Sequence, residues 1–400
     1  MSDSNLILSF HKGDDLDYTP SFKPGILSRT QLQAAVAAKI ITASRKIQDT
    51  QFQPASLDLR LGAKAWRVKS SFLTGKKETV ETKIKSLAMH EIDLTNKGAV
   101  LEKGCVYIAE LMESLDLPKD ITAFANPKSS TGRLDVFTRV IADYSDIFEF
   151  APPKYRGKLY LEISPRSFTI LVRQGSRLSQ LRLRAGDNTS KMDETKRTQL
   201  ITQLTPIYGK HAASKATDGG VPLSINLTGD LSNDKLVGWQ ARENVGLIDV
   251  DGVGRYRAAG FWERITADDL IDGGLVLNPN RFYILASHEY VAIPSDYAAE
   301  MTAYDTRIGE FRAHYAGFFD PGFGMPELGA DKTRAVLEVR SHDVPFFIEK
   351  GQTACRLVYD YLSAPPDVTY GDTGSNYQGQ GLRLSKHFQT PTAKTAEAKP

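Results

Sequence analysis

The chain has 400 residues, of which 41% are hydrophobic and 24% charged, and its formal net charge is +2. That length exceeds what one hydrophobic core usually holds, so we expect two domains with the composition of soluble globular proteins. The nearly balanced charge implies no large basic surface for nucleic acid or membrane, so any basic site must be local.

The N-terminal segment predicts neither targeting nor membrane insertion. Residues 1–25 are polar, contain Gly and Pro, and lack the apolar run of a signal peptide, so a flexible arm is expected there. No stretch reaches 18 apolar residues. Cys105 and Cys355 show no CxxC spacing, which excludes a disulfide scaffold and a thiolate zinc site. We therefore expect a cytoplasmic protein.

The following segments predict one short helix and then β-structure. Residues 28–43 begin with a Ser cap and carry apolar residues at helical spacing. In QPASLDLRLGAKAWRV, Leu57 and Leu59 alternate with polar residues, as in a half-buried strand. Between residues 100 and 184, short apolar runs are broken by Gly, Pro, Asn and Asp, which favours an all-β barrel or sandwich.

An internal repeat organises the rest of the chain. LEKGCVYIAELMESLDLPKDITAFA in the first half matches LNPNRFYILASHEYVAIPSDYAAEM in the second. This alignment places Pro118 on Pro294, an offset of 176 residues (294 − 118). The offset holds within about two residues along the match, which predicts a tandem duplication.

The duplication divides the chain into expected domains. The first copy covers residues 26–186 and the second covers 240–388. Residues 187–239 lose the strand pattern and are expected to form a linker with a helix at KRTQLITQL. Residues 389–400 are a polar low-complexity segment and are expected to be disordered.

The sequence lacks the ligand pattern of zinc nucleoside deaminases. Those enzymes need a His or Cys with a PCxxC pair to hold the metal that activates water. The histidines follow no HxH or HExxH spacing and lie at positions 11, 90, 211, 288, 314, 342 and 387. We therefore expect no protein-bound zinc, and water activation would fall to a carboxylate. The GxxxxGK[ST] phosphate loop is also absent.

PKSSTGR, residues 127–133, is the first of four patterns that carry chemistry. Its hydroxyls, Lys and Arg suit phosphate binding through backbone N–H groups and charge-assisted contacts, and a capped turn is the alternative. The corresponding AYDTR of the second copy keeps Arg307 at the position of Arg133. It has Ala303 opposite Ser129 and has therefore lost a hydroxyl.

The second pattern is a hairpin and the third is a strand glutamate. AGFFDPGFG in the second copy pairs with ADYSDIFEF in the first, and Asp320 could cap the turn or bind a sugar hydroxyl. Each copy then has a glutamate within an apolar strand, Glu162 in KLYLEIS and Glu338 in RAVLEVRS. Such a residue either points outward or lies in a pocket, where burial would raise its pKa as a general base requires.

The fourth pattern is the glycine-rich segment YGDTGSNYQGQG, residues 370–381. It could fold over a ligand, with Tyr370 and Tyr377 stacking and Gln380 donating hydrogen bonds. A flexible linker is the alternative.

Together these motifs resemble the dCTP deaminase branch of the dUTPase-like superfamily. QPASLDLRLG is similar to its N-terminal strand, KSSTGRLDVF to its phosphate motif, AGFFDPGF and VLEV to its nucleoside hairpin and catalytic strand, and NYQGQG to its closing tail. The resemblance implies a mainly β fold of two tandem dUTPase-like distorted jelly-roll β-barrels with a short N-terminal helix. It also implies zinc-free hydrolysis of dCTP to dUTP and ammonia, in pyrimidine deoxynucleotide biosynthesis.

The resemblance further implies how the reaction is catalysed. Glu338 or Glu162 would be the general base that activates water for attack on C4 of cytosine. Ser129 and the backbone carbonyl of Ala316 or Ala142 would position that water. These groups would act on the charged transition state more than on bound substrate.

Charge and substrate contacts are implied in the same way. Arg133 or Arg307 would stabilise developing charge. Other substrate contacts would come from Lys128, Ser130, Ala142, Asp146, Phe318, Asp320, Val336, Leu337, Tyr370, Asn376, Tyr377 and Gln380. Mg²⁺ would be carried by the triphosphate, and dUTP or dTTP are candidate effectors. The family forms its sites between repeats, so a homo-oligomer is expected, with a trimer of duplicated chains as one arrangement.

Several departures from the family pattern point to a single composite site. Ala303 replaces the family serine, Asn376 stands where many members have Lys, and only the second copy is followed by the tail. We therefore predict a site that joins KSSTGR of the first copy to the hairpin, Glu338 and the tail of the second. The complementary combination of residues 303–307 with Glu162 is predicted to be weak or inactive.

Two other functions remain open. A dUTPase would activate water with a hairpin aspartate, and YRG at residues 155–157 resembles its motif, although the strand glutamates favour deamination; a bifunctional enzyme is a variant of this alternative. A non-catalytic nucleotide-binding regulator would account for the lost serine. Release of ammonia or pyrophosphate from dCTP separates these functions.

Overall fold

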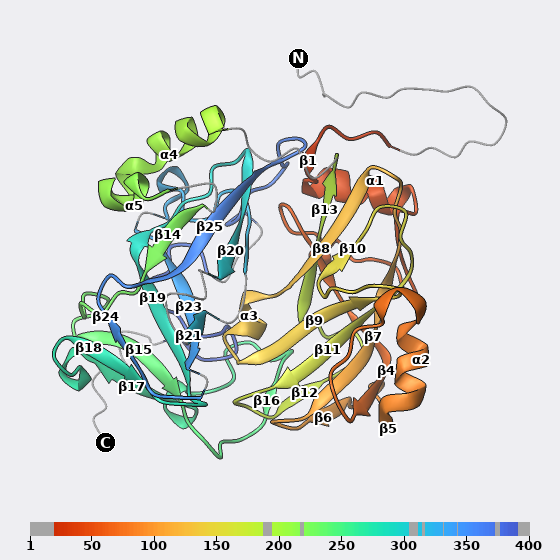
Figure 1. Ribbon diagram of the computed structural model, residues 1–400, viewed down its shortest axis with the longest axis horizontal. Helices are drawn as coiled ribbons and strands as arrows, with labels where there is room; N and C mark the ends of the chain where they lie inside the picture. The colour runs from red at the N-terminus through yellow and green to blue at the C-terminus, as the bar shows by residue number, and fades with distance from the viewer. Residues whose placement is uncertain are drawn as a thin grey trace.

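The computed structural model describes residues 20–186, 194–216, 220–303, 311–313, 317–330, 332–341, 343–372 and 377–390. Most of the expected N-terminal arm and of the expected C-terminal tail lies outside these ranges. The described residues form two β-rich units side by side, coloured red to yellow and green to blue in Figure 1. Among these residues no helix is long and apolar enough to cross a membrane.

The first unit is a distorted barrel of two packed sheets. In one sheet the strands follow the order β1 (Gly25–Ile26), β13 (Ser179–Ala185), β8 (Ile121–Pro127) and β10 (Phe150–Ala151). In addition, β3 (Leu57–Leu59) pairs with β13. In the other sheet the order is β5 (Ala88–Asp93), β4 (Leu61–Val68), β7 (Val106–Asp116), β11 (Arg156–Pro165) and β9 (Val136–Ala142). In addition, β2 (Ile41–Ala43) pairs with β7. The short helices are α1 (Arg29–Ala37), α2 (Val80–Leu87) and α3 (Ser129–Gly132).

The second unit repeats both sheets. One sheet has the order β14 (Val221–Ser224), β25 (Thr353–Tyr361), β20 (Tyr297–Ala303) and β22 (Phe318–Phe319). The other sheet has the order β17 (Trp262–Thr266), β15 (Leu236–Ala241), β19 (Phe282–Tyr290), β23 (Arg334–Ser341) and β21 (Phe311–Ala313). A ribbon of β18 (Gly274–Leu277) and β24 (Phe346–Glu349) completes it, and α4 (Glu194–Tyr208) and α5 (Lys210–Ser214) precede it in the chain.

The predicted duplication and fold class are confirmed. The path β13–β8–β10 corresponds to β25–β20–β22, and β4–β7–β11–β9 corresponds to β15–β19–β23–β21. β8 begins at Ile121 and β20 at Tyr297, an offset of 176 residues (297 − 121). The alternating apolar residues of the sequence therefore form the same sheet twice.

Two predicted element bounds need correction. The helix expected over residues 28–43 ends at Ala37, because the chain turns at Lys39 with a φ of 60° and Ile41–Ala43 then pairs with β7. The segment expected as a linker contains the predicted helix within α4. Its later part, however, belongs to the second unit, because β14 pairs with β25 and β15 with β19.

The outer face of the β19–β23 sheet packs against the first unit. Tyr283 and Leu337 point into the core of the second unit. Their neighbours Phe282, Ile284 and Val336 belong instead to the core cluster of the first unit. Strand alternation thus gives this sheet two buried faces, so the two units share one continuous apolar contact. A further link is β16 (Ile248–Asp249), which pairs in parallel with β12 (Ile170–Val172), itself paired with β6 (Ala99–Leu101).

The equivalent face of the first unit is covered differently. Ile108 and Tyr160, which lie 176 residues before Ile284 and Val336, pack against α2 through Val80. Figure 1 shows α2 on the outer edge of the first unit, far from the second. The first copy therefore buries with its own insertion the face that the second copy buries against another barrel.

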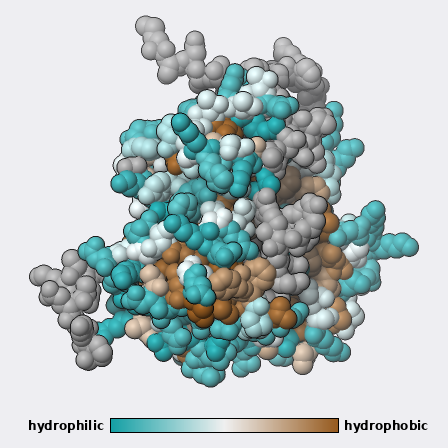
Figure 2. Space-filling model, turned by 60° about the vertical axis from the view of Figure 1, so that its left-hand side comes forward, coloured by the Kyte–Doolittle hydropathy of each residue, from teal (hydrophilic) through white to brown (hydrophobic). Residues whose placement is uncertain are grey.

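The second unit exposes a few large apolar side chains around its two-stranded ribbon. Ile271, Val344 and Phe347 are each at least 43% exposed. Figure 2, which brings this side forward, shows brown apolar areas among the hydrophilic surface.

Candidate functional site

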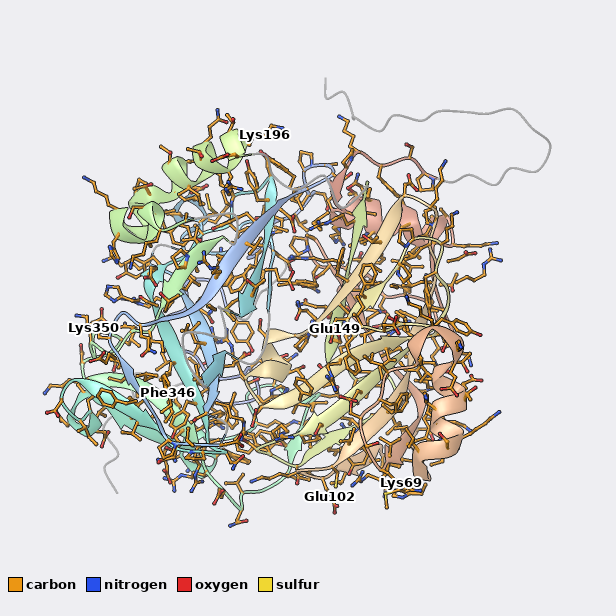
Figure 3. All side chains as sticks on the ribbon, viewed as in Figure 1. Lys69, Glu102, Glu149, Lys196, Phe346 and Lys350 are labelled. Atoms are coloured by element: carbon orange, nitrogen blue, oxygen red, sulfur yellow. The ribbon has the colours of Figure 1, made fainter. Side chains whose placement is uncertain are left out.

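A cavity of about 270 Å³ lies where the two units meet around α3. Side chains from both units fill the surrounding space in Figure 3. The cavity is lined by Gln53, Asp58, Pro127, Lys128, Ser129, Ser130, Arg133, Gln180, Met301, Gly317, Phe318, Phe319, Asp320, Phe323, Val336, Glu338, Tyr370, Tyr377, Gln380 and Lys386. It thus brings together residues of the predicted KSSTGR, hairpin, strand and tail motifs.

The phosphate-type motif forms a single helical turn after β8. The backbone N–H groups of Thr131 and Gly132 donate to the carbonyl oxygen of Lys128 at 2.8 and 3.0 Å, and the N–H of Arg133 donates to that of Ser129 at 3.1 Å. The N–H of Lys128 is held by the carbonyl oxygen of Leu178 at 3.0 Å, which ties the turn to the first barrel. The turn is therefore fixed while its two serines face the cavity.

Glu338 of β23 reaches this turn from the other unit. A Cβ atom placed on Gly132 would lie 2.5 Å from Oε2 of Glu338 and 2.9 Å from Oε1. The glycine of KSSTGR is thus required for close approach of the carboxylate rather than for an unusual backbone conformation. Within the described residues, the carboxylate has no hydrogen-bond or ion-pair partner.

Burial sets the electrostatics of Glu338 and of the nearby Arg133. Glu338 is 5% exposed, and burial raises the pKa of its carboxyl to about 8, partly opposed by the positive charge of Arg133. Burial lowers the pKa of Arg133, which lies over the ring of Tyr377 at 3.9 Å. Its Nη1 donates to the carbonyl oxygen of Arg383 at 2.9 Å. The cavity therefore holds a carboxyl whose pKa lies near neutral pH and, close to it, a fixed cation.

The hairpin is held by an arginine from the other unit. Arg182 on β13 forms a buried ion pair with Asp320 and donates to the carbonyl oxygens of Ala299 and Phe319 at 2.9 and 2.8 Å. Its guanidinium also lies over the ring of Phe318 at 4.1 Å. Burial raises the pKa of Asp320, and the positive charge of Arg182 partly opposes this rise. The predicted Asp320 and Phe318 do line the cavity, whereas sequence reasoning missed Arg182.

The tail residues close one side of the cavity. Tyr370 is fixed by its N–H, which donates to the carbonyl oxygen of Pro321 at 2.7 Å. The side-chain amide of Gln380 donates to the carbonyl oxygen of Arg334 at 3.1 Å, while its buried Oε1 has no partner among the described residues. The predicted Tyr370, Tyr377 and Gln380 are therefore all in place beside the turn.

A cationic end of the cavity was only partly predicted. Lys128 forms an ion pair with Asp58, whose second oxygen lies 3.7 Å from Arg177. Lys386, just beyond the YQGQG motif, lines the same end. The sequence contained a signal for Asp58, since it lies in the QPASLDLRLG motif, but that motif had suggested only a strand.

Three other predicted substrate contacts do not reach the cavity. Leu337 points into the core of the second unit, because it alternates with Val336 and Glu338 along the strand. The carbonyl oxygen of Ala142 accepts from Thr74 at 3.1 Å. Asp146 is exposed beside Lys76. None of the three residues lines this cavity.

Glu162 occupies the same strand position as Glu338 in a different environment. It pairs with Ile108 across β7 as Glu338 pairs with Ile284 across β19. Its Oε1 accepts from Arg139 Nη2 at 2.5 Å and Nε at 3.0 Å, and the same guanidinium lies 3.6 Å from the ring centroid of Phe148. Glu162 is thus neutralised within its own unit and does not line the cavity.

Some predicted residues fall outside the described part of the chain. These are Arg307, Ala316 and Asn376, and the side chain of Ala303 is also not described. In the described residues no group of three or more His, Cys, Asp or Glu side chains could hold a metal ion.

Comparisons with known proteins agree with this architecture. Residues 23–187 match the model of the 2′-deoxycytidine 5′-triphosphate deaminase N-terminal domain, and residues 193–388 match that of its C-terminal domain. The solved structure of 2′-deoxycytidine 5′-triphosphate deaminase from Agrobacterium tumefaciens is 47% identical, with a TM-score of 0.78, and the match covers 85% of this chain and 99% of that one.

Curated relatives match over shorter segments. A "dCTP deaminase, dUMP-forming" of Methanothermobacter thermautotrophicus is 29% identical over 27% of this chain and 54% of the relative. A "dCTP deaminase" of Actinobacillus succinogenes is 30% identical over 34% of this chain and 70% of the relative. The chain thus spans about half the length of the first of these.

Proposed function

The chain belongs to the 2′-deoxycytidine 5′-triphosphate deaminase family, and on that premise we propose that it hydrolyses dCTP to dUTP and ammonia. The observation that carries the proposal is the buried carboxyl of Glu338, which lies against the KSSTGR turn inside a cavity built by both units. A carboxyl in such an environment can take up and release a proton near neutral pH.

Glu338 acts as the general base. It takes a proton from water while the water oxygen bonds to C4 of the cytosine ring, and that proton passes to N3. The second proton of the attacking oxygen is transferred through Glu338 to the 4-amino group, the C4–N bond breaks, and ammonia leaves as C4 becomes a carbonyl. Water and dCTP are thereby converted to ammonia and dUTP without a change in oxidation state.

Other cavity groups bind and orient the substrate. Arg133 stabilises charge that develops on the ring, since its guanidinium is buried beside Glu338. The hydroxyl of Ser129 helps to position the water. Lys128 and Ser130 bind phosphates, and Asp320 accepts a hydrogen bond from a sugar hydroxyl. Mg²⁺ enters bound to the triphosphate and is part of the substrate.

We assign one such site to each chain. The second possible base, Glu162, is paired with Arg139 and lies on the face that α2 covers. A neighbouring repeat would have to replace α2 to build a second site there.

A second reaction, cleavage of the triphosphate, is favoured by the relatives named dUMP-forming. It predicts release of pyrophosphate as well as ammonia. Measuring both products from the same incubation distinguishes the bifunctional enzyme from a deaminase.

The decisive experiment compares Glu338→Gln with Glu162→Gln. Ammonia release from dCTP should be abolished in the first variant, with dCTP binding retained, and little changed in the second. Protein stripped of transition metals and supplied with Mg²⁺ should keep its activity. Equal losses in the two variants would reject the single-site assignment, and no ammonia from the metal-stripped wild type would reject zinc-free deamination.

A further inference from the structure

Lys386 is a cation in the cavity that has no described partner. It lines the cavity beside Lys128 and Asp58. Lys128 is already paired with Asp58, and Asp320 is already paired with Arg182. Among the described residues, no ion pair or hydrogen bond satisfies the Lys386 ammonium, although burial by its surroundings lowers its pKa. Asp58 and Asp251 attract this ammonium only at longer range, and Lys128 and Arg177 repel it. A half-buried ammonium that forms no direct ion pair favours an anionic ligand.

The backbone around Lys386 is fixed at this place. Its N–H donates to the hydroxyl of Tyr377 at 3.1 Å, and its carbonyl oxygen accepts from the N–H of Gly254 at 2.9 Å. The preceding residue, Ser385, donates its hydroxyl proton to the carbonyl oxygen of Ser130 at 2.7 Å. This bond joins the tail directly to the KSSTGR turn.

The residues after Lys386 anchor the same segment. His387 is 2% exposed and lies between the hydroxyl of Ser385 and the carbonyl oxygen of Val250, both at 2.8 Å. Phe388 packs edge-on against Phe261, with ring centroids 5.5 Å apart. The ammonium of Lys386 therefore projects from a rigid support on either side.

We propose that Lys386 binds the terminal phosphates of the substrate and makes the site selective for a triphosphate over a monophosphate. This inference rests on the proposed function, because it takes the bound anion to be the triphosphate of dCTP. The charge of Lys128 is already balanced by Asp58, so the KSSTGR turn supplies hydrogen-bond donors to the phosphates but little net positive charge. Lys386 supplies the remaining charge at the same end of the cavity.

The test replaces Lys386 by Met, with Lys386→Arg as the conservative variant. Lys350→Met, at an exposed lysine labelled on the outer side of the second unit in Figure 3, is the matched control. Loss of one charge-assisted contact is worth about 1.5–3 kcal/mol, or roughly a 10- to 100-fold change in affinity. We expect K386M to raise KM for dCTP by that factor with kcat within about threefold, and the affinity for dCMP to change much less. K386R should recover most of the loss, and K350M should match the wild type.

Binding of inorganic tripolyphosphate by titration calorimetry separates this inference from the deaminase proposal. Weaker tripolyphosphate binding by K386M would support the phosphate role even if no ammonia were released from dCTP. Equal weakening for dCTP and dCMP, or unchanged tripolyphosphate binding in a K386M protein with wild-type melting temperature, would overturn it.

Discussion

Arg182 of the first unit and Asp320 of the second form an ion pair with 3.0 Å between Nη2 and Oδ1, and the two side chains are only 4% and 7% exposed. One residue of the cavity is therefore positioned by the other half of the duplication. Because the same guanidinium also binds two carbonyl oxygens of the second unit, it orients the whole hairpin.

Arg182→Met should weaken both stability and substrate binding. Removing one member of a buried ion pair costs about 3–5 kcal/mol, because the partner charge remains buried. We expect a lower denaturation midpoint and a raised KM for dCTP. The double variant R182M/D320N should recover part of the stability but not the KM, and Arg182→Lys should recover part of both. If R182M changed stability with no change in KM, Arg182 would be structural only.

Gly132→Ala should impair catalysis more than substrate binding. The added methyl group would lie 2.5 Å from Oε2 of Glu338, so the carboxylate must move. A displacement of about 1 Å can cost roughly 100-fold in rate, so we expect that order of loss in kcat by an ammonia assay, with dCTP affinity changed only slightly. Gly260→Ala is the matched control, because no atom lies within 4 Å of its added Cβ. Wild-type kcat in G132A would show that this contact does not position the base.

The rate of deamination should rise with pH through the titration of Glu338. Burial raises the pKa of this carboxyl to about 8, and a general base must be ionised to accept a proton from water. The logarithm of kcat/KM should therefore increase with a slope near one at neutral pH and level off above about pH 8. The measurement is the initial rate of ammonia release at constant ionic strength. A value of kcat/KM that does not change between pH 6 and 9 would contradict the role of Glu338 as general base.

The same shift predicts how stability depends on pH. Since the folded-state pKa of Glu338 is above that of the unfolded chain, the protonated form stabilises the fold below about pH 4.5 and this contribution is lost as the pH rises through 8. Glu338→Gln has no such titration. Its free energy of unfolding relative to the wild type should therefore be higher at pH 8.5 than at pH 5. The free energies come from denaturant unfolding of both proteins at each pH. If the difference between the two proteins were the same at pH 5 and pH 8.5, the raised pKa of Glu338 would be contradicted.

His387 should make the tail acid-sensitive. Burial lowers the pKa of its imidazole to about 4, so the stability that its neutral form provides is present above pH 6.5 and lost as the pH falls toward 4. We expect the wild type to lose more unfolding free energy than His387→Gln between pH 7 and pH 4.5, as measured by urea denaturation. An equal loss in both proteins would exclude His387 as the cause.

Much of the site could be read from motifs along the chain. KSSTGR, the DPG hairpin, the strand glutamate and the YQGQG tail are each short enough for their residue types to indicate their chemistry, and Ser129, Arg133, Asp320, Glu338 and Tyr377 all meet at the cavity. Residues without a motif were missed. Arg182 is one of several arginines on a strand, and Lys386 follows the tail motif without any pattern of its own.

By itself, the sequence determined the duplication and the fold class, because strand alternation and turn residues recur with a constant offset. It could not determine the environment of the two strand glutamates, since Glu162 and Glu338 have similar apolar neighbours in sequence. Tertiary structure decided these environments. Glu162 is paired with Arg139 on the face of the sheet that α2 covers, whereas Glu338 lines a cavity beside Gly132. The physical reason is that the pKa and access of a carboxyl depend on what packs over it, and those residues come from distant parts of the chain.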